Sequence, residues 1–344
     1  MEEKYYSEKI EKDVRYRKDY LDGLESFLSA EQKNAQARRE KFFDLNAYQT
    51  EQENYREAFA DMLGFPLNLK RETPVLQEKT FVVKDKNVNI YRMQLLFWNQ
   101  VKFYGLYFEQ AEKDENTPFC IGLHGGEGTP ELVSSIHLNS ANYNHMVRRV
   151  TDRGVNVFVP QLLLWSTQNY GTEYDRIKLD GKLRQLGGSM TALELYLIRG
   201  AVDYFVEKEN VNEEKIGCFG LSYGGMYALH AAALDKRIKS CYSCSWVNDS
   251  FVHSWTDWSY KNAQNSFTTA EVIGLVAPRK LVVAMGDKDE LFDSRLTQKE
   301  CEQAKKFYRV FKAENAFKCV IFDGVHETDK NDTEMDFLIE GLEE

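Results

Sequence analysis

From about residue 119 onward, short apolar runs alternate with longer amphipathic stretches. The pattern predicts strands at 119–123, 155–160, 215–219, 238–243, 280–285 and 317–322, and helices at 139–152, 191–209, 224–234, 269–275 and 294–311. Alternation of this kind specifies parallel strands that helices cover on both faces. We therefore predict an α/β fold with a mostly parallel central sheet, in which functional side chains gather at the carboxyl ends of the strands.

The first part of the chain has a different pattern. Up to about residue 69 it is charged and poor in glycine, and Val14, Leu21, Leu24 and Leu28 recur at helical spacing. We predict an N-terminal helical extension over residues 1–75 and a main domain over residues 76–344. The extension would be an oligomer contact, a cap near the functional site, or simply a helical segment docked on the domain.

Two further regions shape the expected domain. Runs rich in β-forming residues at 79–83, 88–97 and 102–108 predict antiparallel strands that lead into the sheet. Segments near 161–190 and 246–268 are expected to be cap-like excursions over the strand ends, where loops commonly form a substrate cleft.

Composition narrows the class of protein. The chain has 344 residues, a net charge of −10 and a pI near 5.3, which argues against nucleic acid or an anionic membrane as a partner. The N-terminus lacks the apolar core of a secretion signal, so we expect a cytoplasmic protein with reduced cysteines. Cys241 and Cys244 have zinc-like spacing but no second pair follows them, and no phosphate-loop or zinc-helix motif is present. We expect no metal, no cofactor and a small-molecule substrate.

One serine has the surroundings of a nucleophile. Ser222 lies between the predicted strand at 215–219 and the predicted helix at 224–234, with Gly220 and Gly224 two residues to either side. A sharp strand-to-helix turn strains the central residue and points its side chain outward, and it leaves room only for very small neighbours. The alternative is an ordinary glycine-rich turn.

A serine nucleophile needs a base and a carboxylate that orients the base. His326, in a loop just after the last predicted strand, is the expected base, and His253 is the competing candidate. The acid should follow the strand at 280–285, where Asp287, Asp289 and Glu290 all qualify by their chemistry.

Negative charge that develops on a carbonyl oxygen is stabilised by backbone N–H groups. We expect one donor to be the amide of Tyr223, directly after the nucleophile. The second should be the amide of Gly125 or Gly126, in the His-Gly-Gly loop that follows the buried strand at 119–123. Alternatively, this loop is only a flexible turn.

These residues resemble the α/β-hydrolase superfamily, and within it the branch of enzymes like dienelactone hydrolase and acetyl xylan esterase. The similarity covers about residues 50–342 and involves the motif around Ser222 and the segments 54–67, 231–238 and 275–281. It implies hydrolysis of carboxylic esters through a covalent acyl-serine, often with removal of acetyl groups from sugars. It also places the acid three residues after the glycine that ends the strand, which favours Asp289 over Asp287.

The chain departs from the family pattern in two ways. Glu127 occupies an oxyanion-loop position that is often small, and no secretion signal accompanies an enzyme type that often meets polysaccharides outside the cell. The second departure points to short, imported substrates.

Aromatic residues after the strand at 238–243 are candidates for sugar binding. The flat rings of Trp246, Trp255 and Trp258 would pack against the C–H faces of a sugar, and His124 is a further candidate for substrate contact. The tryptophans would otherwise form an aromatic core beneath a cap. Two other functions remain open, namely a serine peptidase or acyl-peptide hydrolase of the prolyl-oligopeptidase kind, and a non-catalytic binding module.

Overall fold

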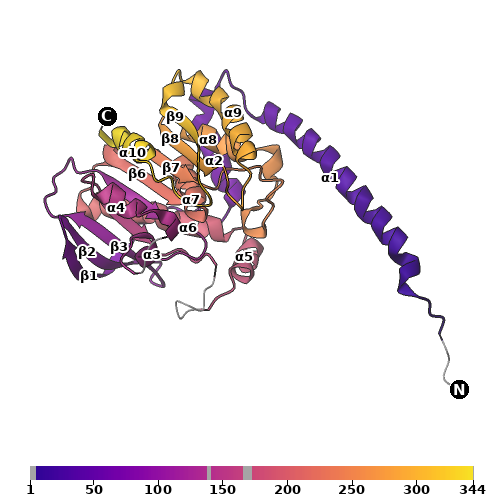
Figure 1. Ribbon diagram of the computed structural model, residues 1–344, viewed down its shortest axis with the longest axis horizontal. Coiled ribbons are helices and arrows are strands. Elements are labelled where there is room, and N and C mark those ends of the chain that lie inside the picture. The colour runs from indigo at the N-terminus through magenta and orange to yellow at the C-terminus, as the bar shows by residue number, and fades with distance from the viewer. Residues whose placement is uncertain (1–4, 138–140, 166–172, 344) are drawn as a thin grey trace.

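The computed structural model describes residues 5–137, 141–165 and 173–343 (Figure 1). Its described residues form a nine-stranded sheet with the order β1-β2-β3-β5-β4-β6-β7-β8-β9. The strands are β1 (Val75–Asp85), β2 (Val88–Phe97), β3 (Val101–Gln110), β4 (Phe119–Leu123), β5 (Asn156–Pro160), β6 (Ile216–Leu221), β7 (Ile238–Cys244), β8 (Lys280–Gly286) and β9 (Phe317–Phe322).

The sheet has an antiparallel part and a parallel part. Strands β1, β2 and β3 form an antiparallel meander, and β3 joins β5 in antiparallel fashion. All pairings from β5 through β4 to β9 are parallel. Two register shifts in β1, at Leu76/Glu78 and Phe81/Val83, interrupt its pairing with β2 at the edge of the sheet.

Helices cover both faces of the sheet. They are α1 (Val14–Phe42), α2 (Tyr48–Leu63), α3 (Pro130–Val133), α4 (Met146–Thr151), α5 (Arg176–Gln185), α6 (Met190–Glu209), α7 (Tyr223–Leu234), α8 (Thr269–Val276), α9 (Ser294–Val310) and α10 (Thr333–Glu343). One hydrophobic core joins the sheet to α2, α6, α7, α8 and α9, and a second core lies on the opposite face beneath α4 and α10. Helix α7 lies in the main core with all twelve of its residues buried, because it is apolar on nearly every side.

The predicted fold class is confirmed, since the sheet is mostly parallel and helices flank it. The predicted strands at 88–97, 119–123 and 317–322 have the observed bounds. The strand predicted at 79–83 begins four residues earlier, at Val75, and the bounds of the others differ by at most two residues. The predicted helix at 139–152 is wrong in its described part, which holds a short 3-10 helix (Ala141–Tyr143) and then α4; residues 139 and 140 lie outside the described residues. Within the expected excursion at 161–190, residues 166–172 also lie outside them, and α5 was not predicted.

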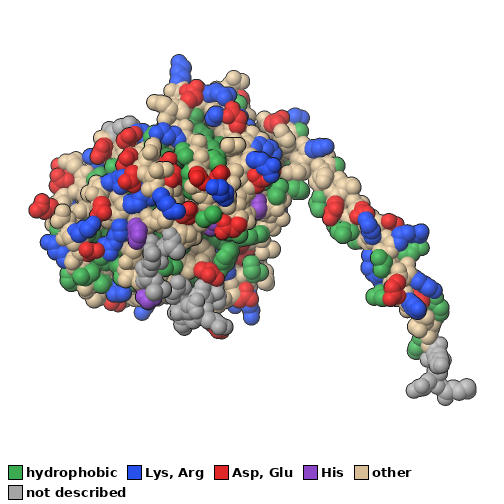
Figure 2. Space-filling model, in the orientation of Figure 1, with side chains coloured by type: hydrophobic (Ala, Val, Ile, Leu, Met, Phe, Trp, Pro, Cys, Tyr) green, Lys and Arg blue, Asp and Glu red, His purple; other side chains and the backbone are tan. Residues whose placement is uncertain are grey.

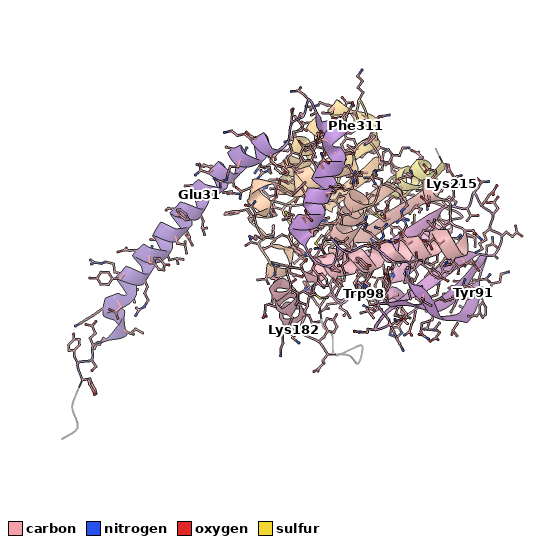
Figure 3. All side chains as sticks on the ribbon, turned by 180° about the vertical axis from the view of Figure 1, so that it is seen from behind. Glu31, Tyr91, Trp98, Lys182, Lys215 and Phe311 are labelled. Atoms are coloured by element: carbon pink, nitrogen blue, oxygen red, sulfur yellow. The ribbon has the colours of Figure 1, made fainter. Side chains whose placement is uncertain are left out.

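Helix α1 projects from the body of the protein as an arm (Figures 1 and 3). Of its 29 residues only Ala35 is buried. The arm meets the body near its carboxyl end, where Arg39 pairs with Glu271 at 3.2 Å and donates to the carbonyl of Gln264 at 2.5 Å. Helix α2, by contrast, is packed into the main core through Tyr48, Phe59 and Leu63.

The six cysteines are free, and five of them are buried. Among the described residues no group of three or more His, Cys, Asp or Glu side chains could hold a metal ion. None of the helices in the described ranges is both long enough and apolar enough to cross a membrane.

Candidate active site

Ser222 lies at the sharp turn between β6 and α7. Its backbone has φ 60° and ψ −124°, a strained conformation for a residue with a side chain. The turn is possible because its flanking residues are glycines. A Cβ at Gly220 would lie 2.4 Å from the backbone of Gly224, and one at Gly224 would lie 2.1 Å from the carbonyl oxygen of Leu123.

His326 follows β9 and is held by a carboxylate. Its Nδ1 lies 2.8 Å from Oδ2 of Asp289, whose side chain is fully buried. The other oxygen of Asp289 accepts from the backbone N–H groups of Leu291 and Phe292 at 2.9 and 3.0 Å. Burial by itself raises the pKa of the Asp289 carboxyl, but the hydrogen bonds from His326 and the two amides outweigh it and lower the pKa below its usual value.

The two other carboxylates on this loop have different partners. Asp287 accepts from the backbone N–H of Gly324 at 3.1 Å, so it closes the turn between the loops after β8 and β9. Glu290 accepts from the backbone N–H of His326 at 3.3 Å. Only Asp289, of the three, contacts the imidazole ring. His253, the competing base, packs against Phe292 with a ring separation of 5.2 Å.

Contacts with the end of β7 bring Ser222 and His326 to the same edge of the sheet. The N–H of Ser222 donates to the carbonyl of Cys244 at 2.8 Å, and the thiol of Cys244 donates to the carbonyl of Glu327 at 3.3 Å. Within the described part of the chain, the Ser222 hydroxyl has no hydrogen-bond partner. Hydrogen bonds between nucleophile and base are often long or absent without substrate and tighten when it binds.

The His-Gly-Gly loop after β4 lies against Ser222. A Cβ at Gly125 would be 3.2 Å from the Ser222 Cβ, but the N–H of Gly125 already donates to the hydroxyl of Tyr143 at 2.8 Å. No acceptor among the described residues takes the N–H of Gly126 or that of Tyr223, the first residue of α7. Of the two glycines, Gly126 therefore has the free amide. Glu127 is exposed on the same loop.

His124 supports this loop from beneath and cannot contact substrate, because it is fully buried. Its Nδ1 lies 2.9 Å from the carbonyl of Gly125, and its Nε2 accepts from the N–H of Leu162 at 2.9 Å. Burial lowers the pKa of His124 to about 4, so the ring is neutral. The prediction of His124 as a substrate contact is wrong, and its role is to hold the loop.

Comparisons with known proteins bear on the family and on the fold. The model of the prolyl oligopeptidase family matches residues 194–299, which include Ser222 and Asp289. The candidate hydrolase YtaP of Bacillus subtilis (strain 168) is 25% identical over 229 residues, 62% of this chain and 74% of that protein.

Solved structures show the same fold at low identity. A candidate acetyl xylan esterase from Bacteroides fragilis NCTC 9343 has a TM-score of 0.64 and 12% identity, covering 86% of this chain and 83% of that one. A glucuronoyl esterase from Solibacter usitatus has a TM-score of 0.62 and 14% identity, covering 88% and 94%. The chain therefore has the α/β-hydrolase fold. It is a serine hydrolase, as the order of its candidate residues predicted.

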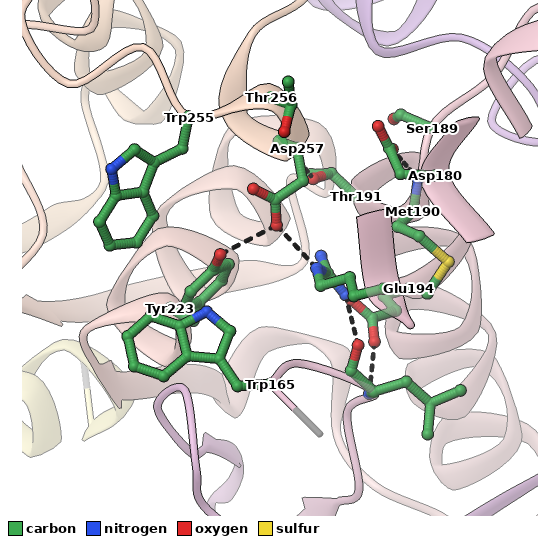
Figure 4. A network of polar contacts seen from close by, with 12 residues as sticks. Trp165, Asp180, Ser189, Met190, Thr191, Glu194, Tyr223, Trp255, Thr256 and Asp257 are labelled. Carbon is green, nitrogen blue, oxygen red and sulfur yellow. Dashed lines mark hydrogen bonds and ion pairs between the residues drawn. The ribbon is translucent and has the colours of Figure 1, made fainter. Parts of the chain in front are cut away.

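The tryptophans of this hydrolase fall into two groups. Trp246 and Trp258 are buried, at 6% and 7% exposure, and they line a small pocket of about 40 Å³, so they are aromatic core and not sugar platforms. Trp255 is 38% exposed and lies 5.9 Å from Trp165, which is 40% exposed. Trp165 also packs against the ring of Tyr223 at 5.9 Å, beside the nucleophile (Figure 4).

A buried ionic network holds Trp165, Trp255 and Tyr223, which together form an aromatic wall beside Ser222 (Figure 4). Arg176 of α5 pairs with Asp257 at 2.7 Å and with Glu194 of α6 at 3.0 Å. Tyr223 donates its hydroxyl to Asp257 at 2.9 Å, and Glu194 accepts from the N–H of Leu163 at 2.7 Å. The network therefore joins the segments that carry Trp165 and Trp255 to the helix that begins after Ser222.

Sequence reasoning missed Tyr143, Trp165 and the Arg176 network. None of them belongs to a motif with fixed spacing, and their partners lie far away along the chain. The only signal was the run of aromatic and glycine residues between β5 and α6, which indicated a cleft but not its lining.

Proposed function

We propose that this hydrolase is a serine carboxylesterase that acts through a covalent acyl-serine. The observation that carries the proposal is the strained Ser222 at the carboxyl edge of the sheet, where the Asp289–His326 pair and two free amides also lie. No metal or cofactor is needed for this chemistry.

Each residue has a role in the proposed reaction. Oγ of Ser222 attacks the ester carbonyl while Nε2 of His326 takes its proton, and Asp289 holds the ring through Nδ1–H. The N–H groups of Gly126 and Tyr223 stabilise the oxyanion. His326 then gives the proton to the leaving alcohol, and a water that His326 deprotonates releases the acid and restores the serine.

The aromatic wall beside Ser222 supports a proposal for the substrate class. The half-exposed rings of Trp165 and Trp255 offer flat apolar faces of the kind that sugars bind, and two structures with the same fold are named as esterases of carbohydrate material. We infer a deacetylase of small acetylated, carbohydrate-like substrates. The likeness to dienelactone hydrolases and the cytoplasmic location stay predictions.

A chromogenic acetate ester tests the nucleophile. Ser222→Ala should lower kcat/KM by at least about 10⁴-fold, because no second hydroxyl replaces the attacking group. Unfolding in urea should be nearly unchanged, which separates loss of chemistry from loss of fold. A variant that is folded and fully active would contradict the proposal.

The match to the prolyl oligopeptidase family favours a second candidate function, a peptidase or acyl-peptide hydrolase. The same residues would then cleave amide bonds. Rates on acetylated sugars, on esters of increasing acyl length and on a peptide panel decide between the two. Release of amines from peptides without any preference for esters would favour the peptidase.

A further inference from the structure

The amino-terminal half of α1 exposes a group of large apolar side chains to solvent. Between Val14 and Leu28, seven large apolar side chains are 41–77% exposed: Val14, Tyr16, Tyr20, Leu21, Leu24, Phe27 and Leu28. In Figure 2 this arm stands clear of the body. A helix in water is stabilised chiefly by packing of its apolar face, so this face calls for a partner.

These side chains lie on one side of the helix. With 3.6 residues per turn, all seven fall within a stripe roughly 160° wide that has Leu24 near its middle. The opposite side carries charges of both signs, including Arg15, Asp22 and Lys33. A helix that binds an anionic membrane would have a basic polar face, which this one lacks.

Two charged residues interrupt the stripe between Val14 and Ala35, and their positions select the partner. Arg17 and Glu31 lie at equal separations before and after Leu24. If two copies of α1 pack antiparallel about Leu24, each Arg17 lies opposite Glu31 of the other copy. In a parallel pair, arginine would face arginine and glutamate would face glutamate.

The same register pairs the apolar residues. Leu24 meets its own copy at the two-fold axis, Leu21 lies opposite Phe27, and Tyr20 lies opposite Leu28. Leu28 lines a groove of about 410 Å³ between α1 and the loop that holds Phe251 and Tyr260, so the partner's Tyr20 would enter this groove. The seven side chains would bury roughly 700 to 800 Å² per copy, close to the usual share of a stable interface.

We propose that α1 is a self-association arm, which pairs antiparallel with α1 of a second copy of this chain about Leu24. The pairing is isologous, so it closes at a dimer and leaves no unpaired arm. The present ion pairs of Arg17 with Asp13 at 3.3 Å and of Arg38 with Glu31 at 3.4 Å are exposed, so both charges are available to a partner.

Sedimentation velocity, which measures the oligomeric state, tests the proposed pairing in variants that reverse the charge of Arg17 or Glu31. The wild type should be a dimer at micromolar concentration. Arg17→Glu and Glu31→Arg should each weaken the dimer at least about tenfold, since each places like charges opposite one another. An equimolar mixture of the two variants should form a heterodimer, and the double variant should dimerise like the wild type.

Lys33→Glu is the matched control, because Lys33 is exposed on the opposite side of the same helix and has no ion-pair partner among the described residues. It should leave the dimer unchanged. A wild type that stays monomeric up to about 100 µM, or single variants that dimerise as well as the wild type, would overturn the proposal. So would single variants whose mixture stays monomeric. A monomer that sediments with phosphatidylcholine vesicles would assign the stripe to a membrane and reject the dimer.

Discussion

Asp289 and Asp287 are chemically alike and two residues apart, yet only Asp289 reaches the imidazole. Asp289→Asn should lower kcat/KM on an acetate ester by about 10³ to 10⁴-fold, because an amide favours the wrong tautomer of His326. Asp287→Asn should lower kcat/KM by less than about tenfold, since the Asp287 carboxylate only accepts a hydrogen bond from the N–H of Gly324. Steady-state kinetics of the two variants make the comparison. Equal losses would mean that the carboxylates share the role.

The sequence could locate Ser222 because its neighbours must be glycines, which leaves a mark in the local pattern. The chemistry of the residues could not separate the two aspartates, whose difference is the direction of a side chain in a turn, and only the family resemblance favoured Asp289. The sequence could not show that the amide of Gly125 is occupied, because Tyr143 comes from a distant segment. Burial of Trp246 and Trp258 was equally out of reach, since it depends on which loops cover them.

At the level of elements, the network around Arg176 is expected to hold the cleft together. Arg176→Met leaves the carboxylates of Asp257 and Glu194 buried without their cation, which should lower the free energy of unfolding by about 3 to 5 kcal/mol. It should also raise KM, because α5 and the segments with Trp165 and Trp255 lose their common anchor. Urea unfolding and ester kinetics measure the two effects.

Lys178→Met, at an exposed position on the same helix, is the control and should change stability by less than about 0.5 kcal/mol. If both variants unfold alike, the network does not stabilise the fold.

Elements with a strong period were predictable, and those fixed by tertiary contacts were not. The strands β4, β5, β6 and β8 are largely apolar runs because both of their faces are covered, and such runs are visible in a single sequence. Helix α5 has only a weak periodicity of apolar residues, and it is held in position by the buried ion pairs of Arg176. The sequence pattern therefore did not predict it. The order of the strands depends on which segments pair across long distances, which no local pattern encodes.

For the whole molecule, two buried histidines predict loss of stability in acid. Burial lowers the pKa of His124 and His230 to about 4, whereas in the unfolded chain it is about 6.5. Their contribution to the free energy of unfolding is complete above about pH 6.5, where the rings are neutral in both states. It is lost as the pH falls toward 4, because the unfolded state binds protons at a higher pH than the folded state does. Each histidine should contribute up to about 3 kcal/mol of this loss.

Urea unfolding between pH 7.5 and 4.5 or so measures the effect. His230→Gln should flatten the dependence of unfolding free energy on pH, whereas His137→Gln, at an exposed site, should leave it unchanged. Identical slopes for the wild type and His230→Gln would show that His230 is not kept neutral by the fold.

The two register shifts in β1 have a consequence for the protein at high concentration. An outer strand with free N–H and C=O groups is a template for uncontrolled stacking of sheets, and the exposed Phe81 and Val83 would add to that hazard. The bulges twist this strand, and the exposed Lys84 places a positive charge on it. Growth of fibrils from this border is thereby discouraged, so the edge strand does not compete with the helical arm that we propose as the contact between copies of the chain.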